Sequence, residues 1–456
     1  MQNLRISGVQ TFPQSESDIR VSFVDRMKII AAANVEITSG SPLGQGQFFS
    51  QDGGETWGQT NLPLVKGDAL HADPAVDWTS DGTAWAITIG YRPAQKQDEL
   101  PILKLRCYRS VDGGATWSYD ADASGTQGGT DRDVMWVDHG PSSPFRDNIY
   151  VTWHNGGPAF VNRRTGPSGS WQTPVQVSGP ETTGTAVGGD IKTNRAGDVF
   201  AFWPDTGSQN LFAAKSTNGG AGFAAPVAMA TTFGSFAIAI PAFNQRRYID
   251  GSTSGPAIYI SGGACRTPAK DLVYAVWTDL SGEAGCTSGS GPDSDVTSKC
   301  KTRIWFTRSI DGGANWEAAR MINNQPSLND QFHPRLAVDD TNGQLIVVYY
   351  DTVADPNRVQ TDLWMQQSLD DGRTWGPAVK VTTAPTDETS AGADTGGAGF
   401  GAGDQYGDYI GLSGYGGIFF PSWTDRRNGA REEIWTTQIR LPVSLPWLSL
   451  LLVSPP

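Results

Sequence analysis

A short motif that recurs along the chain constrains its fold more than any other feature. Each copy begins with Ser, carries Asp or Asn two positions later, continues with glycine and ends on an aromatic residue. Consecutive copies start 60, 106, 93 and 59 residues apart, and the longest interval has room for a degenerate copy, "RTGPSGSW", which ends at Trp171. A period of about 50 to 60 residues is typical of arrays whose units bury their faces on one another. The five clear copies are "SQDGGETW" from Ser50, "SVDGGATW" from Ser110, "STNGGAGF" from Ser216, "SIDGGANW" from Ser309 and "SLDDGRTW" from Ser368.

The segments between these copies have the pattern of β-strands. Runs such as "GTAWAITIGY", "NIYVTWHN" and "QLIVVYYD" are rich in β-branched and aromatic residues and end in turn residues. Shorter runs such as "RIWFTRS" lead directly into the repeated motif. Sustained 3.6-residue periodicity, which would indicate a helix, is absent from the sequence. The sequence therefore predicts an all-β array of four-stranded antiparallel units.

The order of serine, aspartate, glycine and tryptophan in the motif resembles the Asp box of sialidases and related β-propellers. The resemblance implies a hairpin between the third and fourth strands of each blade, on the face away from an active site. This role suits the residues, because the Asp carboxylate accepts backbone N–H bonds, glycine supplies positive φ and tryptophan packs between sheets. We therefore expect structural roles for Asp52, Asp112, Asp311 and Asp370.

A second recurring signature marks the start of each predicted innermost strand and gives the number of blades. It begins near residues 17, 72, 132, 189, 247, 333 and 407, which predicts a single propeller of seven blades over residues 1–442. The early strand 4–12 would complete the last blade and close the ring, and residues 443–456 would form an apolar C-terminal tail. Sialidases usually have six blades, so a six-bladed propeller is the alternative.

The first residues of the inner strands of a propeller line its axis at one mouth. Two positions further along, on the same strand face, lie Arg20, Lys192 and Arg335. Acids and cations would thus converge on one polar well, unless each carboxylate only caps N–H groups of the neighbouring blade. The aligned axial residues are Asp18, Asp73, Asp133, Asp190, Arg247, His333 and Asp408.

Aromatic residues at the ends of the second strands suggest a rim around this well. Trp153, Trp277 and Trp423 each lie beside a polar residue. Such pairs suit a sugar, whose apolar face stacks on a ring while its hydroxyls are hydrogen-bonded. The same tryptophans would otherwise pack inside the blades.

The resemblance to sialidases implies a chemistry for the well. That family clamps a substrate carboxylate with three arginines, attacks with a tyrosine activated by a glutamate and protonates with an aspartate. Here the clamp would be Arg20, Arg247 and Arg335, the nucleophile Tyr409 or Tyr248, and the acid Asp73 or Asp133, with Asp18, Asp190 and Asp408 as further binding residues.

Two departures from the sialidase pattern leave other functions open. The R-I-P motif of the family is absent, and no glutamate is evident beside either tyrosine. One alternative is a noncatalytic propeller that binds carbohydrate or serves assembly. The other is a polysaccharide lyase, in which His333 or a tyrosine would remove a proton from a uronate held by Arg247 or Arg335. A carbohydrate or glycoconjugate is the expected partner in each case but the structural one.

Charge and apolar segments exclude some partners. A net charge of −13 and a pI near 4.8 argue against nucleic acid, which needs clustered Lys and Arg. The apolar segment "LPVSLPWLSLLLVSPP" is short and contains prolines, so it does not predict a transmembrane helix. Oligomeric state leaves no signal in the sequence.

Cysteine and acid patterns bear on the compartment and on metals. Cys286 and Cys300 bracket a polar, glycine-rich insertion that a disulfide would restrain, although unpaired thiols are the alternative. A disulfide favours an extracellular or periplasmic protein whose leader is absent from this chain, and the N-terminus without a signal pattern leaves a cytoplasmic protein as the alternative. No cofactor is expected. The oxygen-rich segment 120–133 could hold a structural calcium ion but lacks EF-hand spacing, and no Cys/His pattern suits zinc.

Overall fold

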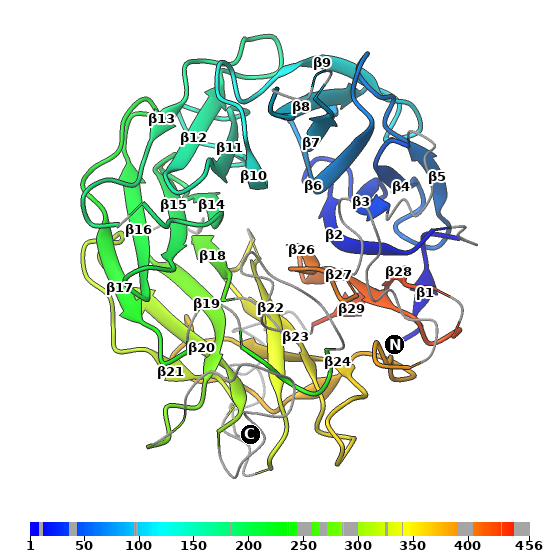
Figure 1. Cartoon of the computed structure of the whole chain (residues 1–456), viewed down its shortest axis with the longest axis vertical. Coiled ribbons are helices and arrows are strands. Elements are labelled where there is room, and N and C mark those ends of the chain that lie inside the picture. Colours follow the sequence, from blue (N-terminus) through cyan, green and yellow to red (C-terminus); the bar gives the residue numbers. More distant parts are fainter. Residues whose placement is uncertain are drawn as a thin grey trace, which may run out of the picture.

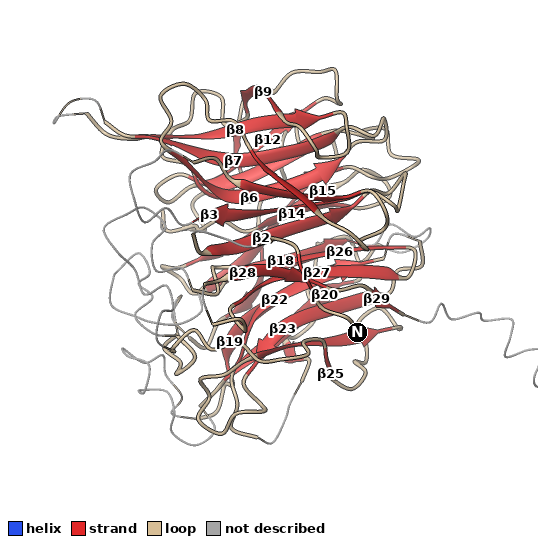
Figure 2. Ribbon diagram, turned by 90° about the vertical axis from the view of Figure 1, so that its right-hand side faces the viewer, coloured by secondary structure: helices blue, strands red, loops and turns tan. Residues whose placement is uncertain are grey.

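The computed structural model is a ring of seven antiparallel β-sheets around a central axis (Figure 1). Each sheet is one blade of a β-propeller, and seen from the side the described chain consists of strands and loops (Figure 2). The described residues are 1–8, 12–35, 43–94, 96, 99–182, 184–234, 236, 238–243, 258–264, 271–284, 286, 300–323, 327–339, 341–390, 405–429 and 431–441.

Six blades are formed by four consecutive strands, ordered from the axis outward. These are β2 (Gln14–Val21), β3 (Ile29–Val35), β4 (Gly46–Ser50) and β5 (Gly58–Asn61); β6 (Leu70–Trp78), β7 (Ala84–Arg92), β8 (Ile102–Ser110) and β9 (Ser118–Asp122); β10 (Asp131–Val137), β11 (Ile149–His154), β12 (Ala159–Arg164) and β13 (Val175–Gln176); β14 (Asp190–Thr193), β15 (Val199–Asp205), β16 (Asn210–Ser216) and β17 (Val227–Thr231); β18 (Ile260–Ala264), β19 (Val273–Leu280), β20 (Thr302–Ser309) and β21 (Arg320–Met321); and β22 (Gln331–Val338), β23 (Leu345–Asp351), β24 (Asp362–Ser368) and β25 (Val379–Lys380).

The seventh blade combines the two ends of the described chain. It contains β26 (Gly411–Tyr415), β27 (Ile418–Asp425) and β28 (Glu433–Thr436), with β29 (Ile439–Arg440) also paired to β27. The N-terminal strand β1 (Leu4–Arg5) pairs with β28 and supplies the outer strand. This pairing joins the last blade to the start of the chain and closes the ring; of the expected strand 4–12, β1 covers Leu4–Arg5.

The strands have apolar side chains on both faces because each blade packs between two others. The second strands show this most clearly: β7, β15, β19 and β23 are buried along nearly their whole length. Inner-strand side chains also bond the next blade, as Asp18 accepts the N–H of Val76 at 3.1 Å and Asp190 accepts that of Gly262 at 2.9 Å. Apolar burial and these polar bonds together fix how the blades stack.

The fifth blade begins later than its sequence signature indicates. Its innermost strand is β18, which starts at Ile260 and not near 247. The segment "ISGGA" lacks the apolar alternation of a strand because side chains of the neighbouring blades leave room only for glycine. A Cβ on Gly262 would clash with the ring of Phe202, and one on Gly263 would crowd Leu336. Arg247 and Tyr248, which the sequence assigned to this strand, lie outside the described residues.

The repeated motif forms the hairpin between the third and fourth strands of a blade. In the first copy one Asp52 oxygen accepts the Ser50 hydroxyl and the Thr56 N–H, and the other accepts the Thr56 hydroxyl. Hydrogen bonds from Thr56 and Ser50 lower the pKa of Asp52 to about 2. Asp112, Asp311 and Asp370 make the equivalent bonds in their own turns. All four aspartates therefore fasten turns.

Candidate functional site

The two ends of the axial channel differ in what surrounds them. The third strand of each blade runs parallel to the first, so the repeat hairpins lie at the end where the inner strands finish. We call this end the hairpin face. The opposite end, where the inner strands begin, is called the acidic mouth after Glu16, Asp73, Asp133 and Asp408.

Four inner strands enter the acidic mouth through the same local structure. In β2, β6, β10 and β22 the pairing with the second strand is interrupted by a bulge near the start. One residue of each bulge has a left-handed backbone, with φ between 50° and 55°. A bulge redirects a side chain, so these residues are equivalent and point toward one mouth. They are Glu16, Asp73, Arg132 and His333.

This register corrects the alignment made from the sequence. Asp18 and Asp133 are not equivalent to Asp73, because Asp18 lies two positions, and Asp133 one position, beyond the left-handed residue of its strand. Sequence reasoning consequently missed Glu16 and Arg132. Aligning the apolar residues that follow, Ile19 with Val76, would have found them, since strand registers are fixed by the buried face.

At the acidic mouth, Tyr409 is surrounded by charged side chains from several blades. The Arg132 guanidinium lies over its ring, 3.7 Å from the centroid, and also over Tyr259 at 4.5 Å. The Tyr259 hydroxyl donates to Asp408 at 3.2 Å. The Tyr409 hydroxyl is buried and makes no hydrogen bond within the described part of the chain. The ring of Tyr409 is therefore held in place by Arg132, while its hydroxyl oxygen is available to a ligand.

A glutamate, absent from the sequence prediction, lies beside this tyrosine. Glu16 accepts the N–H of Asp408 at 2.9 Å and the side-chain amide of Asn34 at 2.6 Å. Gly407 has a φ of +78°, and a Cβ there would clash with Glu16, so glycine allows this close approach. Burial first, and then the Asp73 and Glu16 carboxylates, raise the pKa of Tyr409 well above its usual value, while Arg132 opposes that shift.

Two carboxyl groups of the acidic mouth have raised pKa values. Asp73 accepts the N–H of Arg132 at 2.7 Å, and burial together with the neighbouring Asp131 raises its pKa to about 7. Asp133 is 1% exposed, and neither of its oxygens finds a hydrogen-bond donor among the described residues. Burial and the nearby Asp73 raise the pKa of Asp133 well above its usual range. Asp73 can thus hold a proton near neutral pH, and Asp133 holds its proton to a higher pH than an ordinary aspartate does.

Of the three arginines expected to form a clamp, Arg20 does not reach the acidic mouth and Arg247 lies outside the described residues. Arg20 lies near the end of β2, toward the hairpin face, and pairs with Asp18 at 2.7 Å. Lys192 pairs with Asp190 in the same part of the channel. Arg335 lies between the two ends: it lines a small cavity with Arg132, Tyr259, His333, Asp408 and Tyr409, and it also lines a larger pocket with Arg20 and Lys192. Asp18, Asp190 and Arg20 therefore belong to the channel and not to the mouth.

The expected rim of tryptophans is also corrected. Trp153, Trp277 and Trp423 are only 0 to 1% exposed, so they pack inside the blades and have no open face for a sugar. Trp153, for example, stacks on Phe160 with centroids 5.7 Å apart. Asp279, beside Trp277, accepts the backbone N–H groups of Phe233 and Gly234. In these pairs the tryptophan packs inside the blade, and the polar residue, as at Asp279, bonds backbone groups at the strand end.

His333 lies at the same mouth within an aromatic cluster. Its ring is 3% exposed and packs edge-on against Phe332 at 5.2 Å and Phe243 at 5.8 Å. Its backbone N–H donates a hydrogen bond to the Thr278 hydroxyl oxygen at 3.1 Å. His333 thus forms part of the cavity wall.

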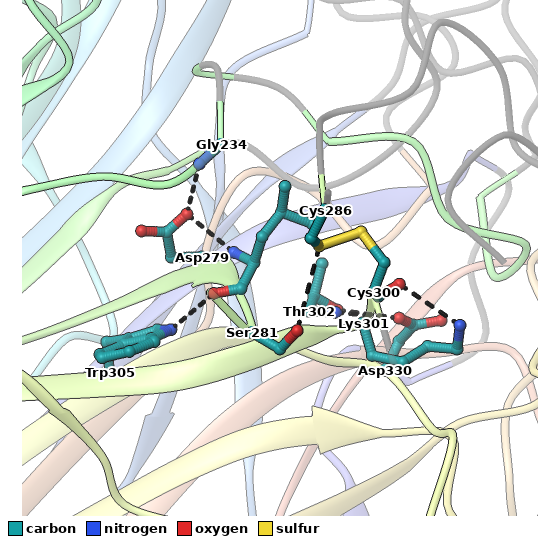
Figure 3. The surroundings of a disulfide bond; sticks show 10 residues. Gly234, Asp279, Ser281, Cys286, Cys300, Lys301, Thr302, Trp305 and Asp330 are labelled. Atoms are coloured by element: carbon teal, nitrogen blue, oxygen red, sulfur yellow. Dashed lines mark hydrogen bonds between the residues drawn. A yellow bond between two sulfur atoms is a disulfide. The ribbon is translucent and has the colours of Figure 1, made fainter. Parts of the chain in front are cut away.

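A disulfide closes one of the loops of the acidic mouth (Figure 3). Cys286 and Cys300 are bonded, and the pair joins the two sides of the connection from β19 to β20. Next to it, Asp330 accepts the N–H and hydroxyl of Thr302 at 3.1 and 3.2 Å. The connection is therefore anchored to the sixth blade as well as crosslinked.

The described residues were searched for metal-binding clusters and for membrane-spanning helices. Across them, no group of three or more His, Cys, Asp and Glu side chains is placed to hold a metal ion. In segment 120–133, Asp120 pairs with Arg164 at 2.5 Å and Asp122 with Arg106 at 2.6 Å, so these carboxylates are already neutralised. A search of the same residues finds no helix long and apolar enough to span a membrane.

Fold and site together define a seven-bladed β-propeller with a buried, acid-rich mouth. No family model matches the chain, and no curated protein matches its sequence. Among solved structures, a protein of unknown function from Dyadobacter fermentans is 13% identical and covers 97% of this chain and 98% of its own, with a TM-score of 0.49.

Two further similar solved structures are mutants of proteins named as an arabinofuranosidase and a sialidase. An α-L-arabinofuranosidase from Fusarium graminearum in complex with an iminosugar inhibitor is 12% identical, covering 81% of this chain and 93% of its own with a TM-score of 0.45. A mutant of NanB sialidase from Streptococcus pneumoniae is 9% identical, covering 78% of this chain and 68% of its own with a TM-score of 0.46. Likenesses at this level assign no substrate and no residue role to this chain.

Proposed function

We propose that the protein is a glycan-active propeller whose acidic mouth hydrolyses glycosidic bonds. The observation that carries the proposal is the convergence of Glu16, Asp73 and Arg132, from equivalent positions of three blades, around Tyr409. Asp73, whose pKa is raised to about 7, or Asp133, whose pKa burial also raises, would donate a proton to the leaving oxygen. Tyr409 would attack the anomeric carbon, with Glu16 accepting the phenolic proton and Arg132 stabilising negative charge on the ring.

The more specific form of the proposal is a sialidase-like exo-glycosidase that acts on acidic sugars. Arg132 lines the small cavity and would face a substrate carboxylate. The acids around Arg132 would oppose this binding less where they are protonated, and burial raises the pKa of Asp73 to about 7. The disulfide of the mouth supports action in an oxidising compartment, extracellular or periplasmic.

The test is hydrolysis of an aryl glycoside panel that includes an α-sialoside and an α-L-arabinofuranoside. Turnover by the wild type that falls by about 10²-fold or more in Tyr409→Phe and Asp73→Asn supports the proposal. The matched control is Tyr119→Phe, whose half-exposed ring lies on an outer strand. Binding of acidic glycans without turnover would instead indicate a lectin-like propeller, and an unsaturated uronate product would indicate a lyase.

A further inference from the structure

The hairpin face of the axial channel contains a pocket that the hydrolysis proposal does not use. Its walls are residues of six inner strands and are largely apolar, with Val21, Leu336, Val338 and Leu412 among the lining residues. Phe23, Trp136 and Tyr415 at its rim are partly exposed, so the pocket opens toward solvent on this face.

Three cationic side chains line the inner part of this pocket: Arg20, Lys192 and Arg335. They are 3 to 6% exposed. The two carboxylates that pair with them, Asp18 and Asp190, each also accept a backbone N–H from the next blade. A third acid near Arg20, Asp77, is occupied by the N–H groups of Trp78 and Val137 and by His139.

Arg335 is the most loosely bonded cation of this cluster, in which three cations face the three carboxylates Asp18, Asp77 and Asp190. Its guanidinium is 3.6 Å from Asp190 and 4.0 Å from Asp18, and it donates no hydrogen bond to any described residue. The Nε of Arg20 is likewise buried without an acceptor. Buried guanidinium donors are costly to leave unbonded, and a carboxylate would satisfy them in bidentate geometry.

We propose that this pocket binds a small organic carboxylate with an apolar body, separately from any glycan at the acidic mouth. The carboxylate would meet Arg335 and Arg20, whereas the body would lie against Leu336, Leu412 and Trp136. Trp136 already stacks with the Lys192 ammonium at 4.6 Å and the Arg20 guanidinium at 5.5 Å, which keeps these cations oriented. An uncharged analogue of the same shape would lose the guanidinium bonds.

The test is calorimetric titration of the full chain with phenylacetate and, as the uncharged match, phenylacetamide. We expect phenylacetate to bind at least about tenfold more tightly than the amide. Arg335→Gln should remove that preference. Because this change leaves two buried carboxylates with fewer partners, Ala337→Leu serves as a second variant that fills the pocket and keeps every charge.

Controls separate this site from the acidic mouth. Ala337→Leu should abolish phenylacetate binding and leave glycoside hydrolysis unchanged, whereas Tyr409→Phe should leave phenylacetate binding unchanged. The proposal is overturned by equal affinity for acid and amide, by no binding of phenylacetate, or by binding that survives Ala337→Leu but is lost in Tyr409→Phe. Failure to hydrolyse any glycoside would not affect it.

Discussion

At the scale of single residues, Asp73 sets how hydrolysis would depend on pH. Burial and Asp131 raise its pKa to about 7, so it holds its proton below that pH and loses it above. If it is the general acid, kcat/KM should fall above pH 7 with an apparent pKa near that value. Asp73→Asn should remove this alkaline limb and lower the rate by about 10²- to 10⁴-fold. An unchanged profile in the variant would assign the acid to Asp133.

The buried Asp133 carboxyl makes a separate prediction about stability. Its raised pKa means that the folded state binds a proton more tightly than the unfolded state, so the free energy of unfolding falls as pH rises above about 4. Asp133→Asn removes the charge that forms at high pH. We expect the variant to be more stable than the wild type at pH 8 by about 1 to 3 kcal/mol, and this gain should shrink toward pH 4.

Urea unfolding at pH 4, 6 and 8 measures this difference. Asp25→Asn, a change at an exposed turn, is the matched control and should show no such trend. A loss of stability in Asp133→Asn at every pH would mean that the ionised carboxylate is paired, contrary to its position without donors among the described residues.

At the scale of elements, the repeat hairpins should depend on pH in the opposite sense. Hydrogen bonds from Thr56 and Ser50 lower the folded-state pKa of Asp52 to about 2. Its contribution is therefore present above the unfolded pKa of about 4 and is lost as pH falls toward 2. Asp52→Ala should lower the Tm by about 1 to 3 °C at pH 7 and have no effect near pH 2. Thermal unfolding followed by circular dichroism at both pH values checks this, and an equal loss at both would assign the effect to packing.

How far the sequence predicts each element depends on which forces act locally. The repeat motif predicts its hairpins well because the bonds of its aspartate lie within eight residues, as Asp112 and Thr116 show. The inner strand β18 is missed because side chains of the neighbouring blades fill the space beside Gly262 and Gly263. Glycine is required there, so the strand shows no apolar alternation. Asp18 and Asp133 are displaced by two positions and one position from the mouth residues of their strands because β2 and β10 each contain a bulge there, and a bulge has no composition signal of its own.

At the scale of the whole molecule, the burial of the tryptophans shows what the sequence cannot separate. Trp153 and Trp423 end strands next to polar residues, which is equally expected of a sugar platform and of a blade edge. Only the stacking of seven sheets, which is a property of the closed ring, decides in favour of packing. The same ring brings Glu16 to Tyr409, although nearly four hundred residues separate them in the chain.

Closure of that ring by β1 yields a prediction for the molecule as a unit. Leu4 and Arg5 pair with Thr436 and Trp435 of β28, and Arg5 also bonds Glu433 at 2.7 Å. Removing residues 1–8 would expose an edge of β28 and uncover the apolar contacts of Ile6, which is 3% exposed. We expect the truncated chain to lose several kcal/mol of stability, about 2 to 5, and to associate through the open edge.

Thermal unfolding and sedimentation velocity measure both effects. Arg5→Gln, which removes the partly exposed ion pair but keeps the strand, should cost no more than about 1 kcal/mol and leave the chain's association unchanged. If the truncated chain were as stable as this control, β1 would be dispensable. The seventh blade would then be held by β26 to β28 alone, through the packing of β26 and β27 against β2 that the full chain also has.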